Sequence, residues 1–176
     1  LHVSFQAGDA TDPRTLPLSI LLNILTGGGS SRLHQQFVEQ EQIALSVGAF
    51  QMEGLDPGLA YFYLTLPPGA DIDAVEARLH EELERVIAEG ISDAELDKAR
   101  NIMIADYWRS LSTIDGKAET LGRAEVFFGD YQLAFSLPDQ LATVTKEQIQ
   151  SVAADIFDRR RMTVGVLRSP AAEDAE

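Results

Sequence analysis

Hydrophobic residues at alternate positions open the chain and predict a strand. Leu1, Val3 and Phe5 are separated by polar residues, as expected when one face of a strand is buried. Residues 16–25 then form an apolar stretch that we interpret as a buried helix, with Pro17 in its first turn. Because the chain starts within a strand and without an initiator methionine, we expect a piece of a longer protein with a truncated first strand.

A run of glycines should end this helix. We interpret Gly27, Gly28 and Gly29 as a tight break at which the backbone approaches a neighbour closely. Ser30 or Ser31 can then cap a second helix, because a serine hydroxyl accepts a hydrogen bond from a free backbone N–H of the first turn. The expected arrangement is therefore helix, glycine break, helix.

A β-hairpin is expected next. Residues 44–53 and 59–66 are rich in β-forming side chains, and the sequence Asp-Pro-Gly at residues 56–58 is typical of a turn between two strands.

Spacings of three and four predict helices in the second half. Apolar residues recur at these spacings over residues 72–87, and Gly90 is suited to end that helix. Ser92 and Glu95 form a capping box, so another helix should begin there. The remaining predicted elements are a helix over residues 116–128, a helix that runs from a capping box at Thr145 to Phe157, and a closing strand over residues 162–167.

This order of elements predicts an α+β fold, with helices layered on a largely antiparallel sheet. The chain has 176 residues, of which 45% are hydrophobic, and this is enough apolar material for one core. We therefore expect residues 1–169 to form a single domain and the acidic residues 170–176 to form a disordered tail.

Composition argues against several classes of function. A formal net charge of −14 would repel phosphate backbones and anionic lipids, so neither nucleic acid nor a membrane surface is an expected partner. The apolar runs are also much shorter than the roughly 20 residues that cross a bilayer. With 0 cysteines the chain has no disulfide and no thiolate ligand, and the periplasm and the cytoplasm both stay open as locations.

The residues that suggest catalysis fit structural roles better. His80 begins neither HExxH nor HxxEH, because Glu84 stands where the second histidine would be needed. We therefore expect no metal in this domain, and we expect His80 on a solvated, charged helix face. Ser30, Ser31 and His34 lack the nucleophile turn and orienting acid of a triad, and the glycines lack the lysine of a phosphate-binding loop.

Residues 25–33, with the sequence LTGGGSSRL, resemble the LGGGxSSRL segment of the pitrilysin/insulinase zinc peptidases. Residues 43–47, 90–96 and 144–149 resemble three further family segments, in the family's order. The chain is most similar to the carboxy-terminal, zinc-free domain, and among family members to the small bacterial, two-subunit members that are like processing peptidases. The resemblance implies the fold of the metallohydrolases related to the mitochondrial processing peptidase.

The resemblance also points to two positions in this domain. In the family, an arginine and a tyrosine seven positions apart are thought to hold the peptide carbonyl, and here they fall on Val38 and Leu45. Neither side chain can donate a hydrogen bond. We expect Val38 and Leu45 to pack against each other or a neighbour, and to leave substrate capture to another subunit.

The function that the resemblance implies is that of a non-catalytic half of a zinc metalloendopeptidase. This half would help to enclose and contact a peptide substrate, while a separate amino-terminal domain binds zinc through HxxEH. The expected partners are that amino-terminal domain, a homologous partner subunit and the peptide. The alternative is a non-proteolytic assembly or scaffold subunit of the same fold, and an upstream sequence without HxxEH would favour it.

Overall fold

The structure is a computed structural model that describes residues 1–168, so the tail predicted at residues 170–176 lies outside the described residues. Its strands are β1 (His2–Gln6), β2 (Ser46–Met52), β3 (Leu59–Thr65) and β4 (Met162–Gly165). Its α-helices are α1 (Thr15–Thr26), α2 (Ile72–Glu89), α3 (Asp93–Ser110), α4 (Ile114–Phe128), α5 (Leu137–Thr143) and α6 (Lys146–Ile156). Shorter segments are the π-helical η1 (His34–Gln40) and the 3-10 turns η2 (Tyr131–Ser136) and η3 (Arg159–Arg161). No helix of residues 1–168 is both long and apolar enough to cross a membrane.

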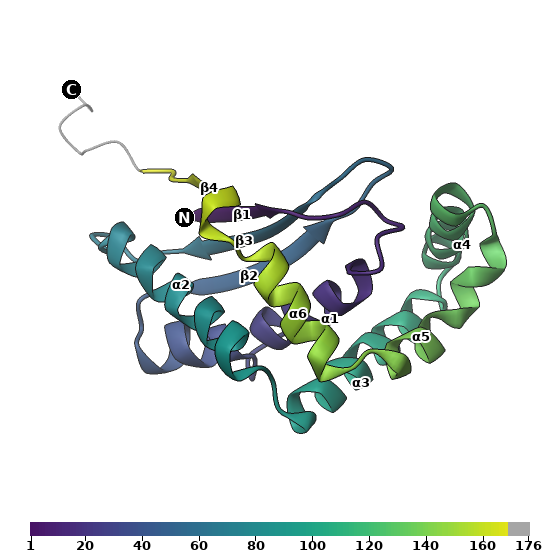
Figure 1. Ribbon diagram of the computed structural model, residues 1–176, viewed down its shortest axis with the longest axis horizontal. Helices are drawn as coiled ribbons and strands as arrows, with labels where there is room; N and C mark the ends of the chain where they lie inside the picture. The colour runs from purple at the N-terminus through teal and green to yellow at the C-terminus, as the bar shows by residue number, and fades with distance from the viewer. Residues whose placement is uncertain (169–176) are drawn as a thin grey trace.

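The strands form one antiparallel sheet in the order β2-β3-β1-β4, and helices α1, α2 and α6 cover one of its faces (Figure 1). The α+β fold and the hairpin predicted from the sequence are therefore confirmed. Val3 of β1 lies opposite Phe62 of β3 and Val164 of β4, so alternate residues of neighbouring strands point to the same face. Phe5 and Phe62 are fully buried on the helix-covered face, and both pack against Phe157 at the end of α6, with ring centroids 5.3 and 5.7 Å away.

Local signals place the helix ends where the sequence predicts them. Gly90 ends α2 with φ +74°, a conformation that glycine adopts without strain. Both predicted capping boxes form, at Ser92 with Glu95 and at Thr145 with Gln148, and each satisfies two free backbone N–H groups. These boxes start α3 and α6.

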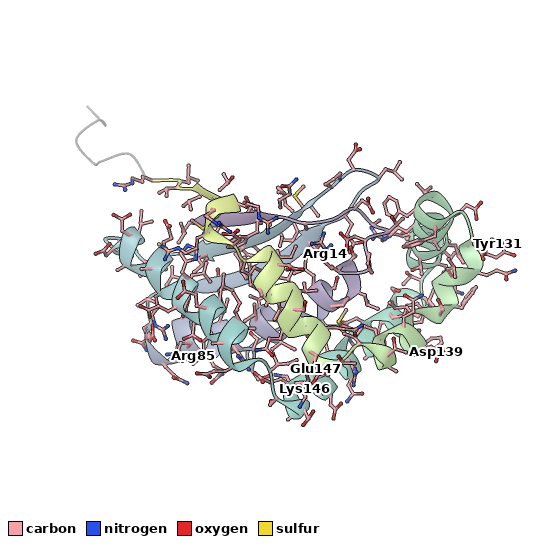
Figure 2. All side chains as sticks on the ribbon, in the orientation of Figure 1. Arg14, Arg85, Tyr131, Asp139, Lys146 and Glu147 are labelled. Carbon is pink, nitrogen blue, oxygen red and sulfur yellow. The ribbon has the colours of Figure 1, made fainter. Side chains whose placement is uncertain are left out.

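Helices α4 and α5 and the turn η2 form what we call the arm, residues 114–143, which extends from α3 to one side of the molecule (Figure 1). In Figure 2, Tyr131 and Asp139 on the arm lie at the opposite side of the molecule from Arg85 of α2. Within residues 114–143 only Ala124, Ala134 and Leu141 are buried. The arm therefore has almost no core of its own.

Candidate functional site

The glycine segment needs glycine at two neighbouring positions for different reasons. At Gly27 an added Cβ would lie 2.5 Å from the Asn23 carbonyl oxygen, which is too close. At Gly28 the space is open, but φ is +91°, which other residues rarely adopt. A close approach of the backbone is thus found at Gly27, whereas Gly28 adopts a backbone conformation that other residues rarely adopt.

The predicted serine caps are wrong. The Ser31 hydroxyl donates a hydrogen bond of 2.6 Å back to the Gly28 carbonyl, and it does not accept one from the following helix. Ser30 instead accepts hydrogen bonds from Lys98 Nζ of α3, at 2.9 Å on its carbonyl oxygen and at 2.5 Å on its hydroxyl oxygen. Ser31 therefore closes the glycine turn, and Ser30 ties that turn to α3.

The two positions aligned with the family's arginine and tyrosine differ in their exposure to solvent. Val38 lies in η1, half-buried, and packs against the core. The chain leaves η1 through Gln42, which has φ +53°. The Leu45 backbone N–H then donates a hydrogen bond of 2.7 Å to the Thr65 carbonyl. The Leu45 side chain is 60% exposed. Val38 is thus partly covered by the core, while Leu45 offers an apolar surface to solvent.

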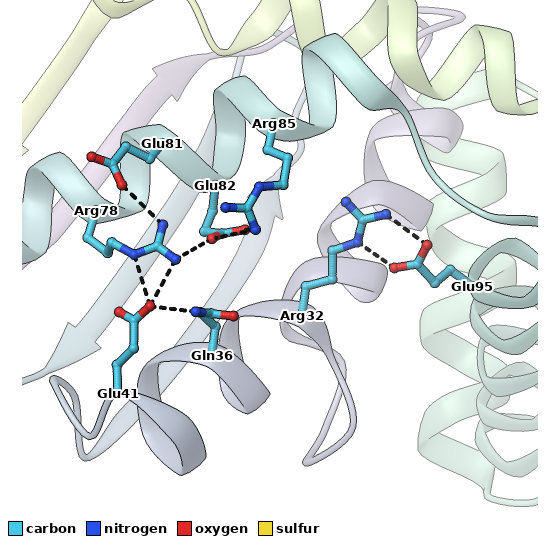
Figure 3. Close-up of polar contacts among 8 residues, drawn as sticks. All are labelled: Arg32, Gln36, Glu41, Arg78, Glu81, Glu82, Arg85 and Glu95. Atoms are coloured by element: carbon cyan, nitrogen blue, oxygen red, sulfur yellow. Dashed lines mark hydrogen bonds and ion pairs between the residues drawn. The ribbon is translucent and has the colours of Figure 1, made fainter.

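Ion pairs join residues 32–41 to the neighbouring helices α2 and α3 (Figure 3). Arg32 donates to Glu95 Oε2 at 2.8 Å and to the Gly90 carbonyl at 3.2 Å, which joins the end of the glycine segment to the turn between α2 and α3. The Arg32 guanidinium, together with hydrogen bonds from Ser92, lowers the pKa of Glu95 to about 2. Glu41, after η1, accepts from Arg78 of α2 at 2.9 and 3.0 Å. These charges hold helices together, which is a structural role.

His80 is buried, so its expected place on a solvated face is wrong. Its side chain is 3% exposed, and its Nε2 has no hydrogen-bond partner among the described residues, with Glu76 Oε1 3.7 Å away. Burial lowers the pKa of His80, because a charged imidazolium would lose its hydration there, and nearby Arg159 acts in the same direction. Within residues 1–168, no group of three or more His, Asp or Glu side chains is placed to hold a metal ion.

The sheet face away from the helices carries aromatic side chains that the sequence analysis did not single out. We call it the outer face, formed by residues on β2 and β3 that alternate with core residues: Phe50, Met52, Leu59, Tyr61 and Tyr63. The Phe50 ring lies 5.1 Å from that of Tyr61 and 6.3 Å from that of Tyr63. A Cβ at Gly48 would lie 2.2 Å from the Tyr63 ring, so this glycine makes room for the ring to lie across β2.

The outer face stays partly open to solvent within residues 1–168. Phe50 and Met52 are 45% and 50% exposed, although the opposite face of the same strands is filled. A signal for this was present in the sequence, because residues 59–64 are apolar without interruption. A strand with one wet face should instead alternate with polar residues.

A cleft of about 770 Å³ lies between the arm and the start of α1. Its walls include Leu16 and Pro17 from α1, Met103 and Tyr107 from α3, and Phe128, Leu133 and Leu137 from the arm. We call it the arm cleft. Sequence patterns could not reveal it, because it depends on the distance between two packed units.

Comparison with known proteins identifies the family. The sequence profile of the family described as the peptidase M16 inactive domain matches residues 1–103, more than half of the chain. The chain therefore belongs to the inactive-domain family of the M16 zinc peptidases, which confirms the resemblance noted in its sequence.

Curated relatives and solved structures agree with this assignment. An uncharacterized zinc protease of Streptomyces coelicolor is 27% identical over 85% of this chain and 32% of its own length. One from Mycobacterium tuberculosis is 31% identical over 81% of this chain and 32% of its own length. The chain thus spans about a third of the length of these relatives.

The fold recurs in solved structures. An inactive peptidase domain from Bordetella parapertussis superposes with a TM-score of 0.81 at 25% identity, over 97% of this chain and 92% of that one. A protease from Helicobacter pylori gives a TM-score of 0.85 at 20% identity, over 92% of this chain and 39% of that one, and at this identity the likeness shows the fold alone.

Proposed function

We propose that this chain is the non-catalytic half of a zinc metalloendopeptidase. In this proposal it helps to enclose and contact the peptide substrate, while a separate amino-terminal domain of the same protein binds zinc. Membership of the inactive-domain family supports the proposal, as do relatives that are named zinc proteases and are about three times as long as the matched region.

The outer face of the sheet is the observation that carries the proposal. Its aromatic side chains are half-exposed, although the helix-covered face of the same sheet is fully packed. Exposed aromatic clusters of this kind mark surfaces that another protein part covers, and tyrosine suits such surfaces because its hydroxyl tolerates residual water. The amino-terminal domain is the proposed occupant, because the relatives contain much more chain than this domain. A homologous partner subunit is the second proposed partner.

This proposal assigns no catalytic group to Val38 or Leu45. In the parent enzyme, Val38→Arg combined with Leu45→Tyr should leave the rate of peptide cleavage within a few-fold. Removing the corresponding arginine and tyrosine from a partner subunit should lower the rate by roughly 10²–10³-fold, as for loss of an oxyanion donor. Loss of cleavage in Leu45→Ala, with folding and assembly intact, would mean that Leu45 contacts substrate directly and that the proposed role is wrong.

The outer face can be tested in the full-length parent protein with Tyr63→Lys. A charge buried at a domain interface opposes docking, so peptide cleavage should fall and the region between the two domains should become sensitive to added protease. Val126→Lys is the matched control, because Val126 is 63% exposed on α4, away from the sheet. Equal behaviour of both variants would remove the outer face from the proposal.

The same protein preparation separates the peptidase from the scaffold alternative. A parent that assembles through the outer face, yet holds no zinc and cleaves no peptide, would be a scaffold subunit. The isolated chain itself should bind no stoichiometric zinc and cleave no peptide. Metal analysis that found about one zinc per chain, lost in His80→Ala, would contradict the placement of the metal in another domain.

A further inference from the structure

The arm is anchored at its base and loosely held at its far end. At the base, Arg100 of α3 donates to the Leu141 carbonyl at 3.0 Å and to the Ala142 carbonyl at 3.2 Å. In the middle, the buried Tyr107 hydroxyl donates to the Ala134 carbonyl of η2 at 2.9 Å. Helix α4 lies beyond these anchors, and of its 15 residues only Ala124 is buried.

Among residues 1–168, an ion pair joins α4 to the loop between β2 and β3 at the arm cleft. Arg123 of α4 is paired with Glu53, in the loop between β2 and β3, and both residues line the cleft. The two side chains are 70 positions apart in sequence and belong to opposite walls. Their pairing therefore depends on how far the two walls are apart.

The other walls of the cleft leave most of the α4 surface uncovered. Phe128 and Leu133 line it and are still 50% and 41% exposed, so their apolar surfaces are incompletely covered by residues 1–168. Apart from Tyr107 and the Arg123–Glu53 pair, some polar side chains in the walls bond within their own segments, such as Ser110 to the Tyr107 carbonyl and Thr120 to the Gly116 carbonyl. Such local bonds persist whether the cleft is narrow or wide.

We propose that α4 is a movable wall of the arm cleft and that the Arg123 and Glu53 pair is the latch that holds it closed. Helices with few buried contacts open at low free-energy cost, so a single partly exposed ion pair can shift their position measurably. Breaking the latch should raise the ratio of open to closed molecules by up to about fivefold. Closing the latch narrows a cleft whose apolar walls are otherwise accessible.

The absence of cysteine from the sequence makes a direct test simple. Leu55→Cys in the hairpin loop and Val126→Cys on α4 place two spin labels at positions that are 70% and 63% exposed, one on each side of the cleft. Double electron–electron resonance on the labelled chain then measures the distribution of distances between them. Arg123→Gln should increase the longer distances, and Glu53→Gln should do the same from the opposite wall.

Two further measurements make the latch falsifiable. Exchange of the charges, with Glu53→Arg and Arg123→Glu together, should restore the narrow distribution, whereas Arg109→Gln should leave it unchanged. Arg109 is a suitable control because it pairs with Asp106 on its own helix and does not span the cleft. The proposal is overturned if both single variants keep the parent distribution while remaining folded by circular dichroism, or if Arg109→Gln widens it equally. Failure of the exchanged pair to restore it would also reject the latch.

Discussion

The sheet with its covering helices and the arm use similar apolar residues in opposite ways. Phe5 and Phe62 in the sheet are fully buried, whereas Phe128 and Phe135 in the arm are 50% and 57% exposed. Burial of apolar surface supplies most of the free energy that opposes chain entropy, so the sheet can maintain its own structure. The arm has little buried surface and depends on its anchors to α3.

The largest expected effect comes from removing one phenylalanine from each region. Phe62→Ala should lower the free energy of unfolding by about 3–5 kcal/mol, because it leaves a cavity between Phe5 and Phe157. Phe128→Ala should cost less than about 1 kcal/mol, because half of its surface is already in water. Urea unfolding of both variants measures the difference, and equal losses would show that the arm shares the core of the sheet.

A second comparison places a side chain at one glycine in each region. Gly28→Val should destabilise the protein by about 1–2 kcal/mol, since φ at this position is +91° and valine is strained there. Gly122→Ala, inside α4 and with open space around it, should stabilise by about 0.5–1 kcal/mol through helix propensity. Thermal unfolding reports both. A neutral result for Gly28→Val would show that the segment is an ordinary loop.

The contact between the glycine segment and α3, the helix from which the arm extends, can be weakened at Glu95, which pairs with Arg32. Glu95→Gln should cost about 1 kcal/mol at neutral pH after solvent screening of this partly exposed pair. The pKa of Glu95 is lowered from 4.5 to about 2, so the stability from its carboxylate is present above pH 4.5 and is lost as the pH falls toward 2. Unfolding measured over this range should therefore be flatter in Glu95→Gln than in the parent. Asp97→Asn, on the exposed side of α3, should keep the parent slope.

The smallest expected effect concerns His80, the buried histidine of α2. Its pKa is lowered from 6.5 by burial, so folding favours the neutral ring, and stability should decrease as the pH falls below 6.5. Between pH 7.5 and pH 5.5 the parent should lose up to about 1 kcal/mol more than His80→Leu does. His34→Gln, changed at a partly exposed histidine, serves as the control. A parent and a His80→Leu variant with the same pH dependence would contradict a buried neutral His80.

Local signals in the sequence predicted most of the fold. The capping boxes at Ser92 and Thr145 and the end of α2 at Gly90 were predicted correctly because each depends on a few adjacent residues. His80 was misplaced because its burial depends on what packs against α2, which the periodicity of one helix does not reveal. The segments η2 and α5 were not predicted individually, since short helices carry little periodic signal.

The candidate site was less predictable, because it depends on how segments pack. The resemblance to the family led to the expectation that Val38 and Leu45 pack against each other or a neighbour. The turn at Gln42, which lies between them in the chain, has a positive φ that left no signal in the sequence. The outer face could have been found from the unbroken apolar run at residues 59–64, while the arm cleft required the tertiary structure.

The backbone conformation of Gly28 favours a D-residue over an L-residue at this position. Its φ of +91° lies where a residue of the mirror-image configuration is relaxed, and the space beside it is open. A chemically ligated chain with D-alanine at position 28 would adopt this turn more readily than one with L-alanine. It would also have fewer conformations to lose than glycine has on folding. The segment that most resembles the family thus contains a site at which stereochemistry alone can stiffen the protein.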